Sequence, residues 1–120
     1  MNKIIKLKLD FLIRCNDDYT GLWEIIRSVR RILGIYDPEE IKHIILKMVL
    51  EFLKLNFIIV GFPLKEGGFS KWEGAPTQLI KQIKENWETI GNDPDPGDVI
   101  WFNITKEGEA ELKRLQAIKN

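Results

Sequence analysis

The sequence has little material for catalytic or metal chemistry, because its 120 residues include one cysteine, Cys15, and one histidine, His43. A single cysteine excludes an internal disulfide and a zinc site made of several cysteines, and it suits a reducing compartment. A histidine base needs a nucleophile or an orienting carboxylate beside it, and the nearby Glu39 and Glu40 are too common an arrangement to indicate one. We therefore expect a structural thiol, a solvated histidine and no enzyme activity.

A net charge is also lacking, since 18 basic residues balance 18 acidic ones. The whole molecule therefore has no field that would attract nucleic acid or an anionic membrane. The apolar runs are too short to span a bilayer, and residues 1–15 intersperse lysine and show no small-residue cleavage site. We expect no signal peptide, no membrane partner and a cytoplasmic location. No Lys-Ser or Lys-Thr pair follows Gly67 and Gly68, so no nucleotide or other cofactor is expected.

Acidic residues are concentrated in one short segment, NDPDPGD at residues 92–98. Calcium loops place oxygen ligands at alternating positions and end in a bidentate glutamate. Asp93, Asp95 and Asp98 have part of that spacing, but prolines stiffen the backbone between them, and no glutamate follows before Glu107. The segment therefore predicts a rigid turn that delivers the next strand, and no metal site.

The sequence does contain enough apolar material for one core, with 44% hydrophobic residues and four tryptophans. A chain of this length is expected to form a single domain over residues 1–120. The apolar spacing predicts an α+β fold that is mostly helical, with about five helices and a small antiparallel sheet of two or three strands. Helices are expected at about residues 3–16, 21–33, 38–56, 76–90 and 106–118, and strands at 57–62 and 99–104.

The first of these segments is open to two interpretations. Ile4, Leu7 and Phe11 form a helical stripe. The same stretch also alternates polar with apolar residues, as an exposed strand would: Ile5, Leu7, Leu9 and Phe11. We favour the helix.

Start signals support the later helices. Thr20 is expected to cap a helix that starts near Gly21, with Glu24 in the matching position of a capping arrangement. Asp37 precedes Pro38, and proline suits the first position of a helix. The last helix is expected to start after a Thr105 cap and to pack through three apolar residues: Leu112, Leu115 and Ile118.

The order of these elements resembles that of a winged-helix domain, a member of the helix-turn-helix group. Three segments carry the resemblance. TGLWEIIRSVRRIL matches the scaffold helix, and DPEEIKHIILKMVLEFLKLNFIIVG matches the recognition-position helix with the first wing strand. WFNITKEGEAELKRL is similar to the way many bacterial winged-helix proteins close the wing. One departure is large: residues 61–98 would form an insertion within the wing that contains a helix, whereas ordinary wings are short hairpins.

The resemblance implies a DNA-binding transcriptional regulator, in which the third helix reads the major groove with Arg, Lys, Asn and Gln. Residues 38–56 supply three lysines against three glutamates and contain no Arg or Gln. That helix offers no net charge to phosphates, which supply most non-specific affinity. DNA binding is therefore the alternative function, with a monomer or a homodimer left open and with these candidate contacts: Arg27, Arg30, Lys42 and Lys47.

The favoured function is recognition of another protein. All arginines except Arg114 lie before residue 32. Because the planar guanidinium recognises carboxylates and phosphates better than lysine does, a charged partner is expected at the N-terminal half. Trp23, Arg27 and Arg30 recur at i, i+4 and i+7 along one edge of a helix, and Trp and Arg dominate interface hot spots. The alternative is that Trp23 completes the core while the arginines are solvated or pair with Glu24 and nearby Asp residues. Arg31 adds to the same polar region.

Two further features are candidates for a partner surface. Leu46, Leu50 and Leu53 extend the apolar arc of the 38–56 helix beyond one face, so the helix at 76–90 or a partner must cover them. Trp72 lies in a glycine-rich loop, where it packs back on the domain or meets a partner. An adaptor or a toxin-immunity protein fits these features. The full set of candidate partner-binding residues is Trp23, Arg27, Arg30, Arg31, Leu46, Leu50 and Trp72.

Overall fold

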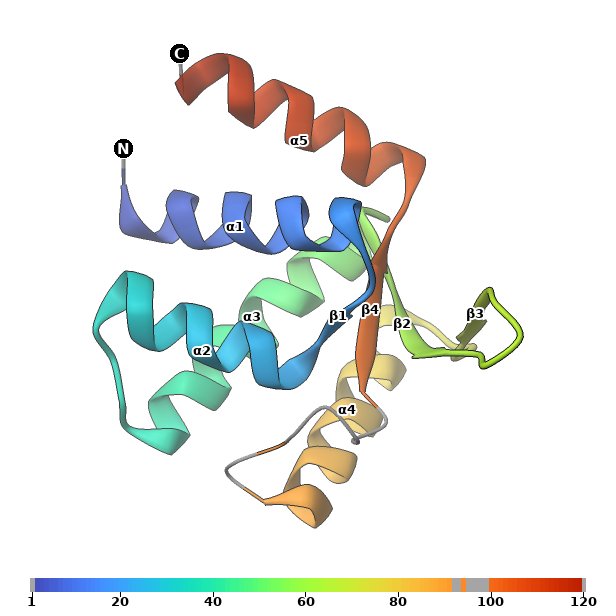
Figure 1. Ribbon diagram of the computed structural model, residues 1–120. Helices are drawn as coiled ribbons and strands as arrows, with labels where there is room; N and C mark the ends of the chain where they lie inside the picture. Colours follow the sequence, from blue (N-terminus) through green and yellow to red (C-terminus); the bar gives the residue numbers. More distant parts are fainter. Residues whose placement is uncertain (1, 92–93, 95–99, 120) are drawn as a thin grey trace.

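The computed structural model of the protein describes residues 2–91, 94 and 100–119 (Figure 1). Within this part the fold is α+β and mostly helical, as the apolar spacing predicts. The elements follow in the order α1 (Lys3–Asp17), β1 (Thr20–Gly21), α2 (Leu22–Leu33), α3 (Pro38–Lys54), β2 (Ile58–Pro63), β3 (Phe69–Lys71), α4 (Pro76–Ile90), β4 (Trp101–Ile104) and α5 (Lys106–Lys119).

The first segment is a helix, so the strand interpretation of residues 3–16 is wrong. The Asn2 side chain caps α1 by accepting a hydrogen bond from the Ile4 amide at 2.7 Å. Leu7 and Phe11 are buried in the core. Leu9 is buried as well, although it lies on a different face of the helix. Because α1 is apolar on two faces, its sequence alternates in a way that imitates a strand.

The start of α2 differs from the prediction. Thr20 does not cap the helix, because it belongs to the short strand β1, where it pairs with Phe102 of β4. Gly21 occupies the cap position without a side-chain hydrogen bond. The end of α2 is as predicted, since Gly34 adopts the left-handed conformation (φ 68°) that terminates helices.

The helix α3 has the predicted cap and a slightly earlier end. Asp37 accepts a hydrogen bond from the Glu40 amide at 3.0 Å, and Pro38 is the first helical residue. The helix stops at Lys54, since Asn56 turns the chain in the left-handed conformation (φ 58°) toward β2.

The sheet has four antiparallel strands in the order β1-β4-β2-β3, whereas two or three were expected. The predicted pairing of the two longer strands is present, with Ile58 opposite Ile104 and Val60 opposite Phe102. The additional strand β3 lies in the segment predicted as a loop, where Gly67 and Gly68 with positive φ turn the chain back along β2. The insertion between β2 and β4 therefore contains a strand as well as the expected helix α4.

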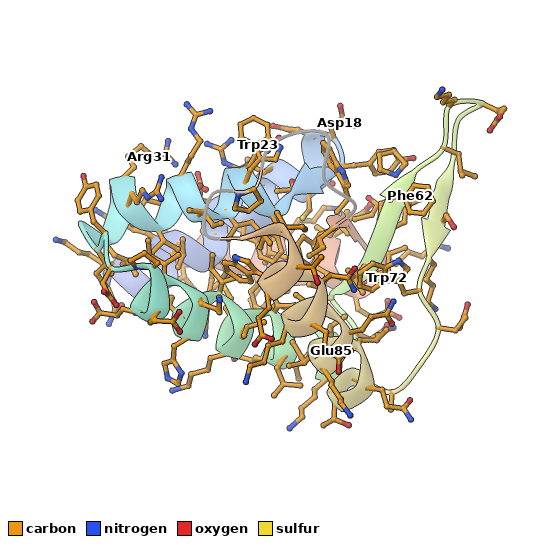
Figure 2. All side chains as sticks on the ribbon, turned by 90° about the horizontal axis from the view of Figure 1, so that it is seen from below. Asp18, Trp23, Arg31, Phe62, Trp72 and Glu85 are labelled. Atoms are coloured by element: carbon orange, nitrogen blue, oxygen red, sulfur yellow. The ribbon has the colours of Figure 1, made fainter. Side chains whose placement is uncertain are left out.

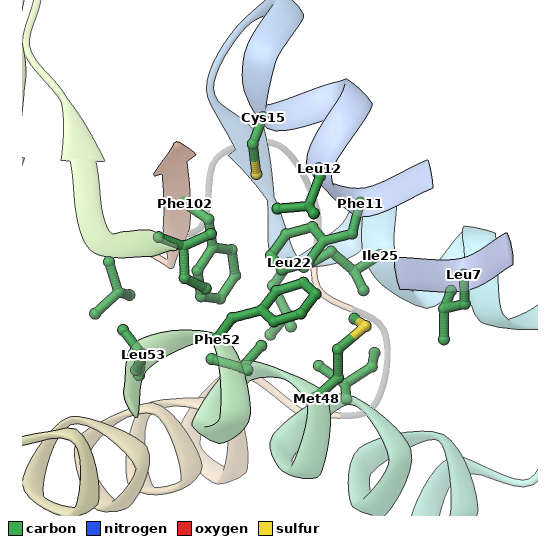
Figure 3. Packing of buried hydrophobic residues seen from close by; sticks show 14 of the residues in the cluster. Leu7, Phe11, Leu12, Cys15, Leu22, Ile25, Met48, Phe52, Leu53 and Phe102 are labelled. Atoms are coloured by element: carbon green, nitrogen blue, oxygen red, sulfur yellow. The ribbon is translucent and has the colours of Figure 1, made fainter. Parts of the chain in front are cut away.

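The core lies between the sheet and the helices α1, α2 and α3 (Figure 3). Phe11 stacks on Phe52 with ring centroids 5.7 Å apart, and it meets the edge of Phe102 at 5.6 Å. The Cys15 thiol is buried in the same cluster. Every helix contributes residues to this core cluster.

The last helix packs against α1, and in Figure 1 α1 lies between α5 and α2. The hydroxyl of Thr105 accepts a hydrogen bond from the Gly108 amide at 3.0 Å, so Thr105 caps α5 as predicted. Leu112 and Leu115 are buried, but the prediction for Ile118 is wrong, because its side chain is 63% exposed.

Candidate protein-binding site

The helix α2 presents an edge of tryptophan and arginine side chains, because its other faces are buried. Ile25, Ile26 and Val29 are in the core, and Ser28 is 2% exposed. Trp23 is half-buried and Arg27 is exposed on the remaining edge. Figure 2 shows Trp23 and Arg31 at one border of the molecule, opposite Glu85 of α4.

Trp23 and Arg27 form a cation–π pair. The guanidinium carbon of Arg27 lies 5.4 Å from the centroid of the Trp23 ring. The ring packs so closely over Gly21 that a Cβ there would lie 2.7 Å from it, which explains why glycine precedes the helix. The ring thus lies between close packing at Gly21 and the guanidinium of Arg27. Preorganised aromatic and arginine side chains of this kind are typical of interface anchors.

The tryptophan forms one wall of a cavity of about 390 Å³, which we call the arginine pocket. Three guanidinium groups line this pocket, two from α2 and one from α1: Arg27, Arg31 and Arg14. The other lining residues are Trp23, Glu24 and Ser28. Sequence reasoning missed Arg14, because only the packing of α1 against α2 brings it to this place.

Asp10 of α1 does not line the arginine pocket, but it binds three of the side chains that do. It accepts hydrogen bonds from Arg14 Nε at 3.0 Å, from Ser28 Oγ at 2.7 Å and from Arg31 Nη2 at 3.1 Å. These charge-assisted bonds fix two of the three guanidinium groups. Arg14 and Asp10 are four residues apart in α1, which is the one signal in the sequence that could have indicated this pair.

Glu24 is the carboxylate that lines the pocket. Its burial raises the pKa of the carboxyl group above the ordinary value, although the nearby Arg14 lowers it. The distance from Arg14 Nη1 to Glu24 Oε2 is 3.9 Å, which is a loose ion pair. Three guanidinium groups line the pocket with one carboxylate, Glu24, and the carboxylates of Asp10 and Asp18 act on Glu24 from outside the lining. The guanidinium groups of the lining suit an incoming carboxylate.

Arg30 does not line the arginine pocket, although its spacing from Trp23 predicts that it lies on the same edge. It is half-buried on the last turn of α2. The structure thus brings together Trp23, Arg27 and Arg31 of the predicted group and leaves Arg30 beside them.

The leucine face of α3 is largely covered from within the chain. Leu53 is 9% exposed, and Leu46 and Leu50 are half-buried. The helix α4 packs along α3, as predicted for the helix at 76–90. Little of this face is therefore left for a partner.

Trp72 packs back on the domain. Its half-buried side chain contacts the core cluster, and its amide donates a hydrogen bond to the Val60 carbonyl at 2.9 Å (Figure 2). Of the two interpretations of this residue, contact within the domain is the one that the structure shows.

The residues of the DNA-binding alternative lie on two different helices. Arg27 and Arg30 are on α2, whereas Lys42 and Lys47 are on α3. The Lys42 side chain is 13% exposed, and its amine lies 5.5 Å from the Trp87 ring centroid. Lys47 is exposed, together with His43 and Glu51 on the same helix, and Glu51 pairs with Lys8 at 2.9 Å. The exposed side of α3 thus has mixed charge.

The described residues show no metal or membrane feature. They contain no group of three or more His, Cys, Asp or Glu side chains that could hold a metal ion. The acidic segment with Asp93, Asp95 and Asp98 lies outside the described residues, so its prediction stays a prediction. None of the helices within the described part has both the length and the apolar composition needed to cross a bilayer.

No protein-family model, no curated protein and no solved structure matches the chain.

Proposed function

We propose that the protein is a non-enzymatic binding module that recognises another protein through the arginine pocket of α2. The observation that carries this proposal is the Trp23 ring, paired with Arg27, in the wall of a pocket that three guanidinium groups line. Tryptophan and arginine supply most of the energy in protein interfaces, and arginine pairs with carboxylates in planar geometry. The partner surface should therefore present aspartate or glutamate beside an apolar residue.

We further propose that the scaffold is winged-helix-like. The chain runs through the helices and strands in the order that the resemblance implies, and β4 pairs with β2, the strand that directly follows α3. The insertion with β3 and α4 between those two strands is the departure from an ordinary wing. An adaptor or an immunity protein that neutralises a bacterial toxin, acting in the cytoplasm, would use such a scaffold without catalysis or a cofactor.

The DNA-binding regulator is kept as the alternative, but the positions of its residues give it less support. Lys42 contacts Trp87 and pairs with Glu39, and the exposed stripe of α3 has mixed charge. A DNA-binding helix needs cations that are free to meet phosphates. This observation favours the protein-binding proposal.

The test is capture of the partner by variants of the arginine pocket. The tagged protein is incubated with lysate of its own source, and bound proteins are identified by mass spectrometry. Arg27→Glu should reduce the amount of the main partner at least about tenfold, because it places a like charge against the partner's carboxylate. Arg27→Lys keeps the charge but loses the planar fork, so an intermediate loss is expected.

The matched control is Lys84→Glu, which makes the same charge change at an exposed position of α4. It should capture as much partner as the wild-type protein. Equal capture by wild type and Arg27→Glu, with both proteins folded by circular dichroism, would refute the assignment of the site.

A further inference from the structure

The helix α1 has a second apolar side, on which Leu9 is buried in the core cluster and Ile5 is 38% exposed. Ile5, Leu9 and Ile13 recur every four residues and therefore lie on one side of the helix. They form the floor of a second cavity of about 580 Å³. We call this cavity the α1 groove.

The walls of the α1 groove come from the ends of two other helices. Ile32 of α2 forms one wall and Ile118 of α5 forms the other. In Figure 1 the end of α5 and the end of α2 lie on either side of α1, at the same side of the molecule as its start. Ile5 is 38% exposed and Ile118 is 63% exposed, so apolar surface is open to solvent on the floor and on one wall.

A helix is the shape that this groove accepts. Helices pack by inserting side chains between those of their neighbours, and a floor helix with two flanking helix ends offers a seat for one more. The apolar side chains of the incoming helix would recur at i, i+3, i+4 and i+7 to meet Ile5, Leu9 and Ile13.

The charges at the rim define which helix fits. Lys6 and Arg31 are the cations of the lining, and Asp10 is its carboxylate. Asp10 already accepts hydrogen bonds from Arg14, Ser28 and Arg31. No carboxylate in the described part of the chain pairs with Lys6, so the rim has a positive excess.

We infer that the α1 groove binds the apolar face of an acidic amphipathic helix of the partner protein. This inference rests on the proposed function and adds the kind of segment that the partner presents. Arg31 lines both cavities, so the groove and the arginine pocket are adjacent parts of one surface. A carboxylate on the flank of the helix would reach the arginine pocket while its apolar face fills the groove.

A second copy of the chain does not fit the groove as well. A two-fold symmetric contact through the groove brings the same patch of both copies together. Both sides of the contact would then carry Lys6 and Arg31 against the single carboxylate of Asp10, and an excess of like charge in an interface is unfavourable. An acidic partner removes this repulsion.

The first test is site-specific cross-linking. A photoreactive benzoylphenylalanine is placed at position 118, and separately at position 84 of α4 as the control. The proteins are irradiated in lysate of their own source, and the cross-linked peptides are sequenced by mass spectrometry. Position 118 should label one partner segment with apolar residues at helical spacing and an excess of Asp and Glu, and position 84 should not label it.

Three results of the cross-linking would overturn the inference. These are labelling of a second copy of this chain, labelling of a lipid or other small molecule, and labelling of protein segments without the acidic amphipathic pattern. Absence of any product at position 118 counts against the inference as well.

The second test is a titration with the cross-linked segment as a synthetic peptide. Ile118→Ser and Lys6→Glu should each raise the Kd about tenfold, and the Lys6→Glu loss should shrink at high salt. Both positions are exposed, so neither change removes core packing. Lys84→Glu should leave the Kd unchanged.

The two proposals fail in different ways. If Arg27→Glu abolishes partner capture while Lys6→Glu and Ile118→Ser do not, the arginine pocket is the site and the inference about the groove is wrong. If none of the three variants reduces capture, the proposed function is wrong and the inference falls with it.

Discussion

The Ser28 hydroxyl donates a hydrogen bond to Asp10 Oδ2 at 2.7 Å, and this bond joins α2 to α1 behind the arginine pocket. Ser28 is 2% exposed, so its hydroxyl cannot turn to solvent when the carboxylate is removed. Asp10 also accepts from Arg14 and Arg31, which makes it the common partner of three donors.

Asp10→Ala should therefore destabilise the fold by about 2–3 kcal/mol, because a buried hydroxyl and two guanidinium groups lose their acceptor. Urea unfolding followed by circular dichroism measures the change in the free energy of unfolding. Ser28→Ala should cost about 1 kcal/mol, and the double variant should cost less than the two single changes together. Additive costs would show that Asp10 and Ser28 do not interact.

Gly108→Ala should destabilise the fold by about 1–3 kcal/mol. A Cβ at this position would meet the Phe57 carbonyl and the Ile104 side chain, so the first turn of α5 would have to move away from β2 and β4. The measurement is again urea unfolding. Glu107→Ala, at an exposed neighbouring position, is the control and should change stability little. Equal stability of Gly108→Ala and wild type would contradict the close packing of α5 against Phe57.

Cys15 should be unreactive in the folded protein. Burial raises the pKa of its thiol to about 12, with an opposing contribution from the nearby Thr20 hydroxyl. At pH 8 the thiolate fraction is then on the order of 10⁻⁴, and the sulfur is also shielded from reagents. Labelling with Ellman's reagent should be slow in buffer and fast in denaturing urea. Rapid labelling of the native protein would show that the contact between α1 and the core opens readily.

The same pKa predicts how stability changes in alkali. The folded-state pKa of about 12 lies above the ordinary value of 9.0, so the unfolded chain loses this proton first. The contribution of Cys15 is full below pH 9 and falls as the pH rises toward 12. Cys15→Ala should therefore lose less stability than wild type above pH 9. Parallel pH profiles of the two proteins would rule out a raised thiol pKa.

Glu24→Gln should gain stability relative to wild type as the pH rises from 4 to 7. Burial raises the pKa of Glu24 above 4.5, so ionisation of this carboxyl weakens the fold. Its contribution to stability is full below pH 4.5 and is lost as the pH rises through the folded-state pKa. The neutral amide avoids that loss. Thermal unfolding at several pH values measures the difference, and Glu73→Gln at an exposed position is the control.

Duplex DNA should not bind with the steep salt dependence of a specific regulator. Lys42 is covered by its contact with Trp87, and the cations of α3 are balanced by glutamates. Binding is measured by the fluorescence anisotropy of a short labelled DNA duplex at low salt. Tight binding that falls steeply with added salt, and that Lys47→Glu weakens, would support the regulator instead.

The helices could be predicted from the sequence because their signals are local. Four residues lie at helix ends in the structure, where their types favour the start or the end of a helix: Gly34, Asp37, Pro38 and Thr105. The strands β1 and β3 could not be predicted, because two or three residues are too few to show a period. Thr20 shows the conflict directly, since its propensity to cap a helix is overridden by its pairing with Phe102.

The candidate site could be predicted in part. The spacing of Trp23 and Arg27 places both on one edge of α2, and this needs only the helical period. The contributions of Arg14 and Asp10 depend on which face of α1 meets α2, and a single sequence does not define that angle. In the sequence, the second apolar side of α1 shows only as an alternation of polar and apolar residues that also fits a strand.

The strand order has a consequence for how the protein is made. β1 and β2 do not pair with each other, and both hydrogen-bond to β4, which is the last strand in the chain. On the ribosome the helices α1 to α3 emerge first, and they must wait for residues 101–104 before the sheet can close over them. Until then Phe11, which stacks on Phe52, lacks its edge contact with Phe102, so the nascent chain exposes apolar surface that the finished sheet covers.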